Sequence, residues 1–195
     1  MEKLQNQIIS ASDLPLKITD SFPNQPYYKI QLTRKITSSE GVGIFGGFFS
    51  TGGRVTASDY SGRVTSDQLL SCYQVGIHYE KMVNENSRIT PFIQTQLSIL
   101  STRLKLKDEI IFANGSRAEE ITLLTAQNVA IEPVIGVEIN MLPFPLRFGV
   151  GFLFNITDFP LHLKGNKDAK LRINGSYFSA NLSGIRLSIS SGLGF

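Results

Sequence analysis

Apolar residues alternate with polar ones at every second position over long segments, and this feature most constrains the fold. In residues 121–140, seven of the ten odd positions are Val, Ile or Leu, against two of the ten even positions. Such an alternation places the aliphatic side chains on one face of an extended strand. A helix would need an apolar period near 3.6 residues, which is hard to find anywhere in the chain. The sequence therefore predicts an all-β protein.

The same alternation recurs in 28–36, 69–81, 88–99, 146–156 and 184–195, and the glycine-rich segment 42–55 is also strand-like. Together with 121–140 these segments make seven strands. Short connections at 38–41, 84–87 and 142–145 alternate with longer polar ones at 57–67, 105–120 and 163–170. The pattern predicts an antiparallel up-and-down meander, one domain over residues 1–195, with tight turns at one rim and long loops at the other.

An eighth strand is needed if the meander closes as a bacterial single-chain barrel, because such barrels have even strand numbers. The best candidate is 4–19, in which Leu14, Leu16 and Ile18 alternate weakly. It would pair with the C-terminal strand, so that residues 1–25 supply the first strand and a loop. Asn174-Gly175 is a strong hairpin signal that we interpret as a bulge or a turn in an extracellular extension. A ten-stranded barrel is the alternative.

Two environments fit these strands. In a soluble barrel the aliphatic face is the core, whereas in a transmembrane barrel it meets lipid and the polar face lines the lumen. The strand lengths favour the membrane, because 9–11 residues cross a bilayer and several segments exceed that. The predicted inner face is rich in Gly, Ser, Asn and Gln, and aromatic residues lie near strand ends. Charged residues make up only 18% of the 195 residues, fewer than the quarter usual in soluble domains.

The C-terminal strand has its apolar residues in one phase up to the last position. The closing stretch resembles the sorting signal of the small outer-membrane β-barrels of Gram-negative bacteria, the OmpA/OmpX-type group, although Ser191 departs from the alternation. The resemblance implies a porin-like barrel in the outer membrane, recognition by the barrel-assembly machinery, and outer-membrane lipid and other outer-membrane proteins as partners. Residues 1–7 do not form a signal peptide, so this location is expected of a mature form. The positions that match the signal are Ile185, Leu187, Ile189, Leu193 and Phe195.

The interior of an eight-stranded barrel is just wide enough for side chains. We interpret the charged residues on the polar faces, with one histidine, as a network of ion pairs and hydrogen bonds that fills it. A conducting pathway is the alternative, and Gly149, Gly151 and Asn155 could leave the gap that it needs. The predicted lumen residues are Lys29, Lys35, His78, Glu80, Arg88, Glu132, Glu138, Arg147 and Arg186.

Catalysis, cofactors and nucleic acid are not expected. The two histidine contexts, His78-Tyr79-Glu80 and His162-Leu163-Lys164, do not match the His-x-Ser of the lipid A deacylases, and a loop site near His162 and Asp158 is a minor alternative. A single cysteine, Cys72, forbids an internal disulfide and a cysteine-based zinc site. Basic residues are scattered, unlike those of a nucleic-acid binder. The sequence predicts a structural, adhesive or complex-subunit role, with a narrow channel or transporter and a soluble lipid-binding barrel as alternatives.

Overall fold

The computed structural model describes residues 5–6, 9, 17–20, 26–60, 62–83, 88–140, 145–173 and 175–191. The prediction of an all-β antiparallel fold is confirmed. No helix among these residues is long and apolar enough to cross a membrane. The strands are β1 (Lys17–Asp20), β2 (Tyr28–Lys35), β3 (Glu40–Asp59), β4 (Gly62–Met82), β5 (Ile89–Phe112), β6 (Arg117–Ile139), β7 (Leu146–Asn155), β8 (His162–Leu163), β9 (Asn166–Lys170), β10 (Arg172–Ile173), β11 (Ser176–Tyr177) and β12 (Gly184–Ser191).

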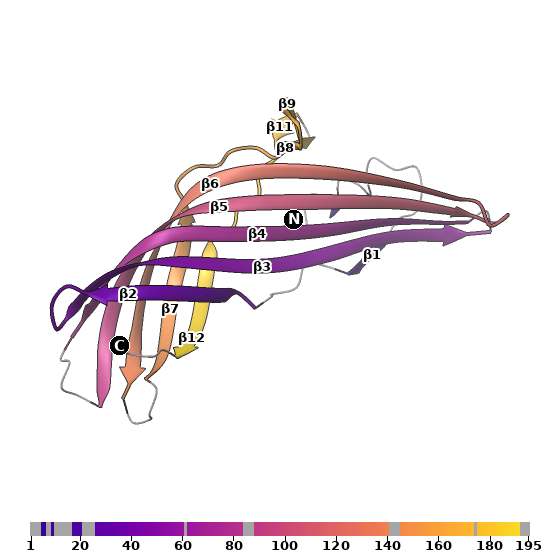
Figure 1. Ribbon diagram of the computed structural model, residues 1–195. Coiled ribbons are helices and arrows are strands. Elements are labelled where there is room, and N and C mark those ends of the chain that lie inside the picture. Colours follow the sequence, from indigo (N-terminus) through magenta and orange to yellow (C-terminus); the bar gives the residue numbers. More distant parts are fainter. Residues whose placement is uncertain are drawn as a thin grey trace.

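One sheet contains all strands except β10 and β11, and it curls into half of a barrel (Figure 1). The order β2-β3-β4-β5-β6-β7-β12 is that of a meander, with β8 to β11 inserted in the chain between β7 and β12. Because each pair is antiparallel and seven strands follow one another, the edge strands β2 and β12 run in the same direction. Within the described residues no ladder joins these two edges.

The expected eighth strand over 4–19 is wrong where the structure describes it. Gln5, Asn6 and Ile9 have helical backbone, and Lys17–Asp20 is the only strand among the described residues of this part of the chain. This strand, β1, pairs with β3 at residues 54–56 and not with β12. It continues the line of β2 along the same edge of β3, because β2 pairs with residues 41–48. The weak alternation around Ile18 therefore indicates a short edge strand and not a strand that closes the barrel.

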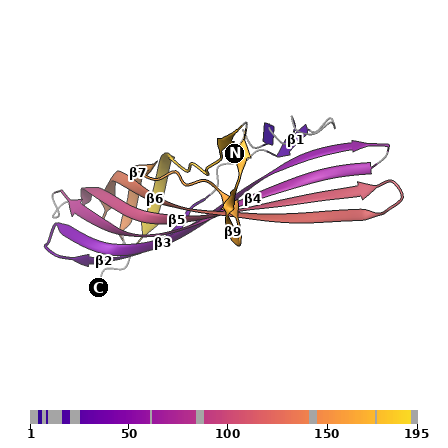
Figure 2. The same cartoon turned by 90° about the horizontal axis from the view of Figure 1, so that it is seen from above.

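The predicted long loops 57–67 and 105–120 are also wrong, because both are continuations of strands. The hairpins β3–β4 and β5–β6 turn tightly and project as a four-stranded arm beyond β7 and β12 (Figure 2). Charged side chains of the predicted loops form ion pairs across these strands: Asp67 with Arg54, Lys107 with Glu119 and Arg117 with Glu109. Cross-strand ion pairs let charged residues occupy a sheet, so polarity alone does not mark a loop here.

The residue types on the two faces exchange along the strands. The even-numbered residues of β5 face the interior up to Leu104. In the half-barrel they include Gln94 and Gln96, and farther along the strand, toward the arm, they include Leu100 and Leu104. On the outer face, Leu97 and Ile99 give way to Ser101 and Arg103. The half-barrel thus has an apolar outside and a polar inside, whereas the arm has the opposite arrangement.

The segment 157–183 covers the inner face of the arm. Its Leu161 and Ala180 are buried against Leu70, Leu104 and Leu124 of the arm strands. The segment adds β8 and β9 to the edge of β6 above β7, and it forms the separate hairpin β10–β11 (Figure 1). Gly175, with φ of +79°, lies in the turn of that hairpin. Gly175 is therefore in a turn, which agrees with the second of the two interpretations of this dipeptide, and Asn174 lies outside the described residues.

β12 is an edge strand with a strongly exposed apolar face. Ile185, Leu187 and Ile189 lie on the outside, and Leu187 is 81% exposed. These three residues belong to the predicted sorting signal, whose other members, Leu193 and Phe195, lie outside the described residues.

Candidate functional site: a polar interior beneath an apolar layer

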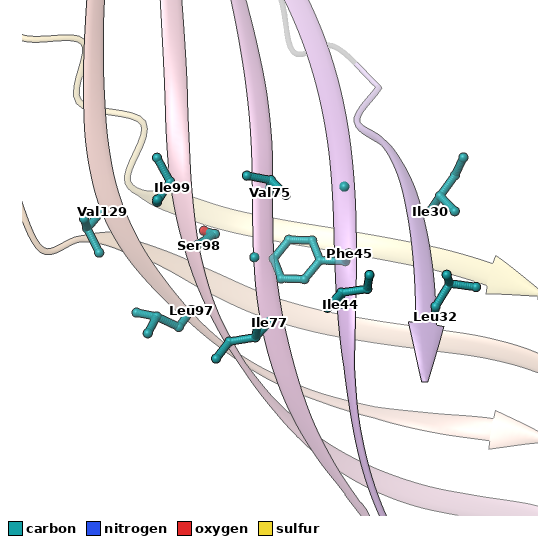
Figure 3. A pocket seen from close by; sticks show the side chains of 12 residues that line it. Ile30, Leu32, Ile44, Phe45, Val75, Ile77, Leu97, Ser98, Ile99 and Val129 are labelled. Carbon is teal, nitrogen blue, oxygen red and sulfur yellow. The ribbon is translucent and has the colours of Figure 1, made fainter. Parts of the chain in front are cut away.

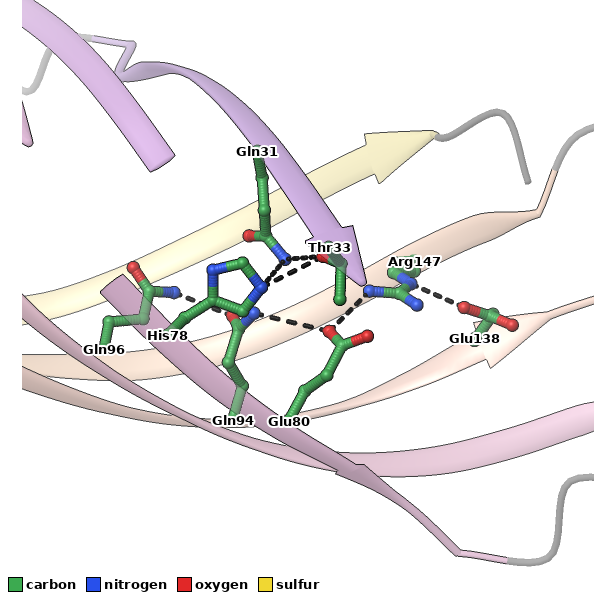
Figure 4. A network of polar contacts seen from close by, with 8 residues as sticks. All are labelled: Gln31, Thr33, His78, Glu80, Gln94, Gln96, Glu138 and Arg147. Carbon is green, nitrogen blue, oxygen red and sulfur yellow. Dashed lines mark hydrogen bonds and ion pairs between the residues drawn. The ribbon is translucent and has the colours of Figure 1, made fainter. Parts of the chain in front are cut away.

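A buried ion-pair cluster occupies the interior of the half-barrel. Arg147 of β7 donates to Glu80 of β4 (Nη1 to Oε2, 3.0 Å) and to Glu138 of β6. Gln94 donates to the same Glu80 oxygen over 3.5 Å, and Gln96 donates to Gln94 over 2.8 Å (Figure 4). Both carboxylates are buried, so the guanidinium is the cation that compensates their charge. The cluster joins β4, β5, β6 and β7 through side chains.

His78 lies beside this cluster and contacts the edge strand β2. Its Nε2 atom is 3.0 Å from Thr33 Oγ1 and 3.1 Å from the amide nitrogen of Gln31 (Figure 4). Within the described residues β2 pairs only with β3, and these contacts attach it to β4 over Gly43, the residue of β3 between Thr33 and His78. The ring is buried, and its Nδ1 atom has no hydrogen-bond partner among the described residues.

A second ion pair reaches across the curl of the sheet. Arg186 of β12 donates to Glu132 of β6 over 3.2 Å and to Gln74 of β4 over 2.9 Å. Its guanidinium carbon also lies 4.8 Å from the ring centroid of Tyr27, just before β2. Gln74 in turn donates to Ser98 over 2.9 Å. Side chains therefore connect the two open edges although their backbones do not pair.

The structure places seven of the nine sequence-predicted lumen residues in the interior. Lys29 is half-buried, with its Nζ atom 5.6 Å from the centroid of Phe45. Lys35 and Arg88 are exposed, and their place in a lumen stays a prediction. Lys35 is the last residue of β2, and Arg88 precedes the first residue of β5. Strand phase alone points both side chains inward, but the sheet ends there and leaves them at the rim.

An ion pair marks the same rim. Lys81 and Glu40 lie 3.1 Å apart where β3 begins and β4 ends. The hydrogen bond from Lys81 lowers the pKa of the Glu40 carboxyl.

An apolar layer lies above the polar cluster, and the alternation did not reveal it. Cys72, Leu100, Ala130 and Leu153 are fully buried together, with Phe49 and Leu182 packed against them. These residues are on the inner faces of four strands and separate the polar cluster from the apolar side of the arm. The signal was present in the sequence, because Leu100, Leu104 and Leu106 change the apolar phase of β5 from odd to even positions.

The glycines on the inner face leave no gap. A Cβ atom at Gly149 would lie 2.7 Å from Ser188 Oγ, and one at Gly151 would lie 2.9 Å from a Glu132 oxygen. The space at these positions is therefore already filled by neighbouring side chains. Asn155, the third residue of the expected gap, has a buried side-chain amide without a partner among the described residues.

The other candidate chemistry is sparse. His162 pairs with Thr125 across β8 and β6, with 3.3 Å between Nε2 and Oγ1. Among the described residues, no group of three His, Cys, Asp or Glu side chains is arranged to hold a metal ion.

The outer face carries an apolar band that ends at an aromatic row. Tyr28, Phe48 and Tyr73 are cross-strand neighbours on β2, β3 and β4, and the last two rings lie 4.9 Å apart. On one side of this row, toward the rim, the outward residues of β2 to β5 are mostly aliphatic, and on the other side those of β3 to β5 are mostly polar. Within the band, an open hollow of about 700 Å³ is lined by side chains of β2 to β6 (Figure 3).

The fold and site define a curled antiparallel β-sheet with a buried polar cluster inside and an apolar band outside. No family model, curated protein or solved structure matches the chain.

Proposed function

We propose that the chain is an outer-membrane β-barrel protein with a structural, adhesive or complex-subunit role. In this proposal the half-barrel lies in the lipid bilayer, and the arm with segment 157–183 stands in water above it. The observation that carries the proposal is the reversed burial of the half-barrel, where glutamates and glutamines are inside and isoleucines are outside. A water-soluble fold would expose a large aliphatic surface at high cost.

The height of the apolar band supports the proposal. Along β5, β6 and β7 with the residue that follows β7, the outward and mostly apolar residues span 89–99, 129–139 and 146–156, which is eleven residues each. Eleven residues extend about 34 Å along a strand, or about 24 Å vertically at a 45° tilt. This agrees with the apolar band of about 25 Å on membrane barrels. The aromatic row of Tyr28, Phe48 and Tyr73 corresponds to an interfacial girdle.

Closure completes the proposal. Unpaired backbone groups cost several kcal/mol each in hydrocarbon, so β2 and β12 require partners in the bilayer. Because these edges run in the same direction, one further strand antiparallel to both would close an eight-stranded barrel.

The two alternatives have less support. A soluble lipid-binding barrel would place its aliphatic face inside, yet Ile135 and Ile185 are on the outside. A channel would require a continuous polar path, yet the layer of Cys72, Leu100, Ala130 and Leu153 crosses the interior.

Extraction and gel mobility test the membrane assignment. We expect the mature chain to partition into the membrane fraction and to require detergent for extraction. We also expect faster migration in an unboiled gel sample than in a boiled one, because a folded barrel resists unfolding by detergent. A folded monomer recovered in buffer without detergent would contradict the proposal.

Planar-bilayer recording tests the closed interior. We expect no discrete conductance steps from the wild-type chain, because side chains fill the space at Gly149 and Gly151 and an apolar layer lies above. Steps of uniform size that disappear when Leu100→Trp is reconstituted at equal density would instead favour the channel.

A further inference from the structure

The hollow in the apolar band has a floor of bare backbone. Two cross-strand rows of outward residues border it, one running through Ile30, Gly46 and Val75, the other through Leu32 and Ile77. Gly46 has no side chain where its neighbours carry aliphatic ones. A Cβ atom added there would meet only a backbone oxygen at 4.0 Å. The volume of about 700 Å³ lies within the 300–1,000 Å³ common for ligand sites, and its lining is almost wholly aliphatic (Figure 3).

Two unpaired cations stand above this hollow. Arg103 and Lys105 follow Ile99, a lining residue, on the outer face of β5. Arg103 is four residues beyond Ile99, about 13 Å along the strand. Neither cation forms an ion pair with any described residue. Arg103 lies between Ser71 of β4 and Thr125 of β6, and Lys105 lies between Leu69 and Leu123 of the same two strands. No carboxylate is therefore directly opposite either cation.

The carboxylates on the outer face of the arm strands β4 to β6 are already paired. Asp67 is held by Arg54, Glu109 by Arg117, and Glu119 by Lys107 and Arg117. Among the described residues of β4 to β6, three cations on this face lack an ion pair: Arg63 near the β3–β4 turn, and Arg103 and Lys105 next to the apolar band. Arg103 and Lys105 are at the level where headgroups would lie if the proposed function holds. Charge-assisted hydrogen bonds from arginine and lysine to phosphate are among the strong ones.

We propose that this outer face binds a phosphate-bearing membrane lipid, with an acyl chain in the hollow over Gly46 and the headgroup phosphate between Arg103 and Lys105. The inference rests on the proposed membrane location and adds a specific binding site and headgroup chemistry for a lipid on the outer face. Tyr73 and Ser101, one cross-strand row above Ile99, lie between the two parts of the site. The site would distinguish an anionic lipid from a zwitterionic one through the two cations alone.

Lipid titration of the purified full chain in detergent tests the site. The probes are a short-chain phosphatidic acid, the phosphatidylcholine with the same chains, and inorganic phosphate. The readout is the midpoint temperature of unfolding. We expect phosphatidic acid to raise the midpoint at about tenfold lower concentration than phosphatidylcholine, equivalent to about 1.4 kcal/mol, and inorganic phosphate to have no effect.

Two variants separate the parts of the site. Gly46→Leu fills the hollow and should weaken the effect of both lipids, with Val75→Phe as a second filling variant if Gly46→Leu does not fold. The double variant R103Q and K105Q should abolish the difference between the two lipids while keeping the response to phosphatidylcholine. Val150→Leu, on the outer face of β7 away from the hollow, is the control and should behave as wild type.

The results also distinguish this inference from the proposed function. Equal responses of wild type and all variants would overturn the lipid site, as would stabilisation by inorganic phosphate alone. If the chain needs detergent but shows no lipid preference, the result contradicts only the lipid site. If the chain is folded and monomeric without detergent, the result contradicts the proposed function as well.

Discussion

Arg147→Met is expected to destabilise the protein by about 3 kcal/mol, the lower end of the cost of breaking a buried ion pair. The substitution keeps most of the side-chain volume but removes the guanidinium between Glu80 and Glu138. Both carboxylates are at most 9% exposed, so two negative charges would then face each other without a cation. The free energy of unfolding, measured by urea titration in detergent or bilayers with gel mobility as the readout, checks this value.

A matched control comes from the arm. Arg117 pairs with Glu109 and Glu119 in the same way, but its side chain is 54% exposed. Exposed ion pairs contribute about 0–1 kcal/mol, so Arg117→Met should change stability little. Replacing Glu80 and Glu138 by Gln in the Arg147→Met background should restore most of the loss, because the uncompensated charge is then gone. Equal effects of the two arginine variants would show that the interior carboxylates are hydrated.

Ile135→Arg is expected to destabilise the folded protein in a bilayer by about 2–4 kcal/mol, the cost of an arginine near the middle of the lipid face of a barrel. Ile135 lies on the outer face of β6, 64% exposed, between Val129 and Ile139 at the ends of the apolar band. The fraction folded in lipid vesicles, followed by gel mobility, and the free energy of unfolding from the bilayer measure the effect.

Gln127→Arg is the control for this experiment. Gln127 is on the same face of the same strand, one outward position beyond Val129 and outside the apolar band, so its variant should be close to neutral. If the outer face were in water, both substitutions would leave the free energy of unfolding nearly unchanged, because replacing an exposed surface residue usually has little effect on stability. A neutral Ile135→Arg in vesicles would therefore contradict the membrane location while leaving the fold unaffected.

The alternation in the sequence was enough to predict the sheet and the orientation of most strands. Leu69, Tyr73 and Val75 share one face, and His78 and Glu80 share the other, as period-two spacing requires. The same spacing could not predict which inward-facing side chains would contact one another. Arg147 and Glu80 are 67 residues apart and come together only because the sheet curls.

The failures of the sequence-based prediction have a common physical cause. The alternation of apolar and polar residues indicates that a strand has two different faces. It does not indicate where the strand ends or what covers each face. The segment 105–120 was interpreted as a loop because it is charged, although Lys107 and Glu119 pair across β5 and β6. Strand phase predicts that Lys35 and Arg88 point inward, but phase does not indicate that the sheet ends beside them. The eighth strand was inferred from strand number and not from a strong pattern.

The sequence by itself determined an all-β antiparallel chain, because the period of the side chains fixes strand geometry before any tertiary contact forms. It also determined which face of each half-barrel strand is aliphatic. Only the tertiary structure decided that this aliphatic face lies outside, since the same pattern fits a curl in either sense. The structure also placed the apolar layer of Cys72 and Leu100 across the interior and left Arg103 and Lys105 unpaired above Ile99. These features depend on contacts between strands far apart in the chain, and local periodicity carries no information about them.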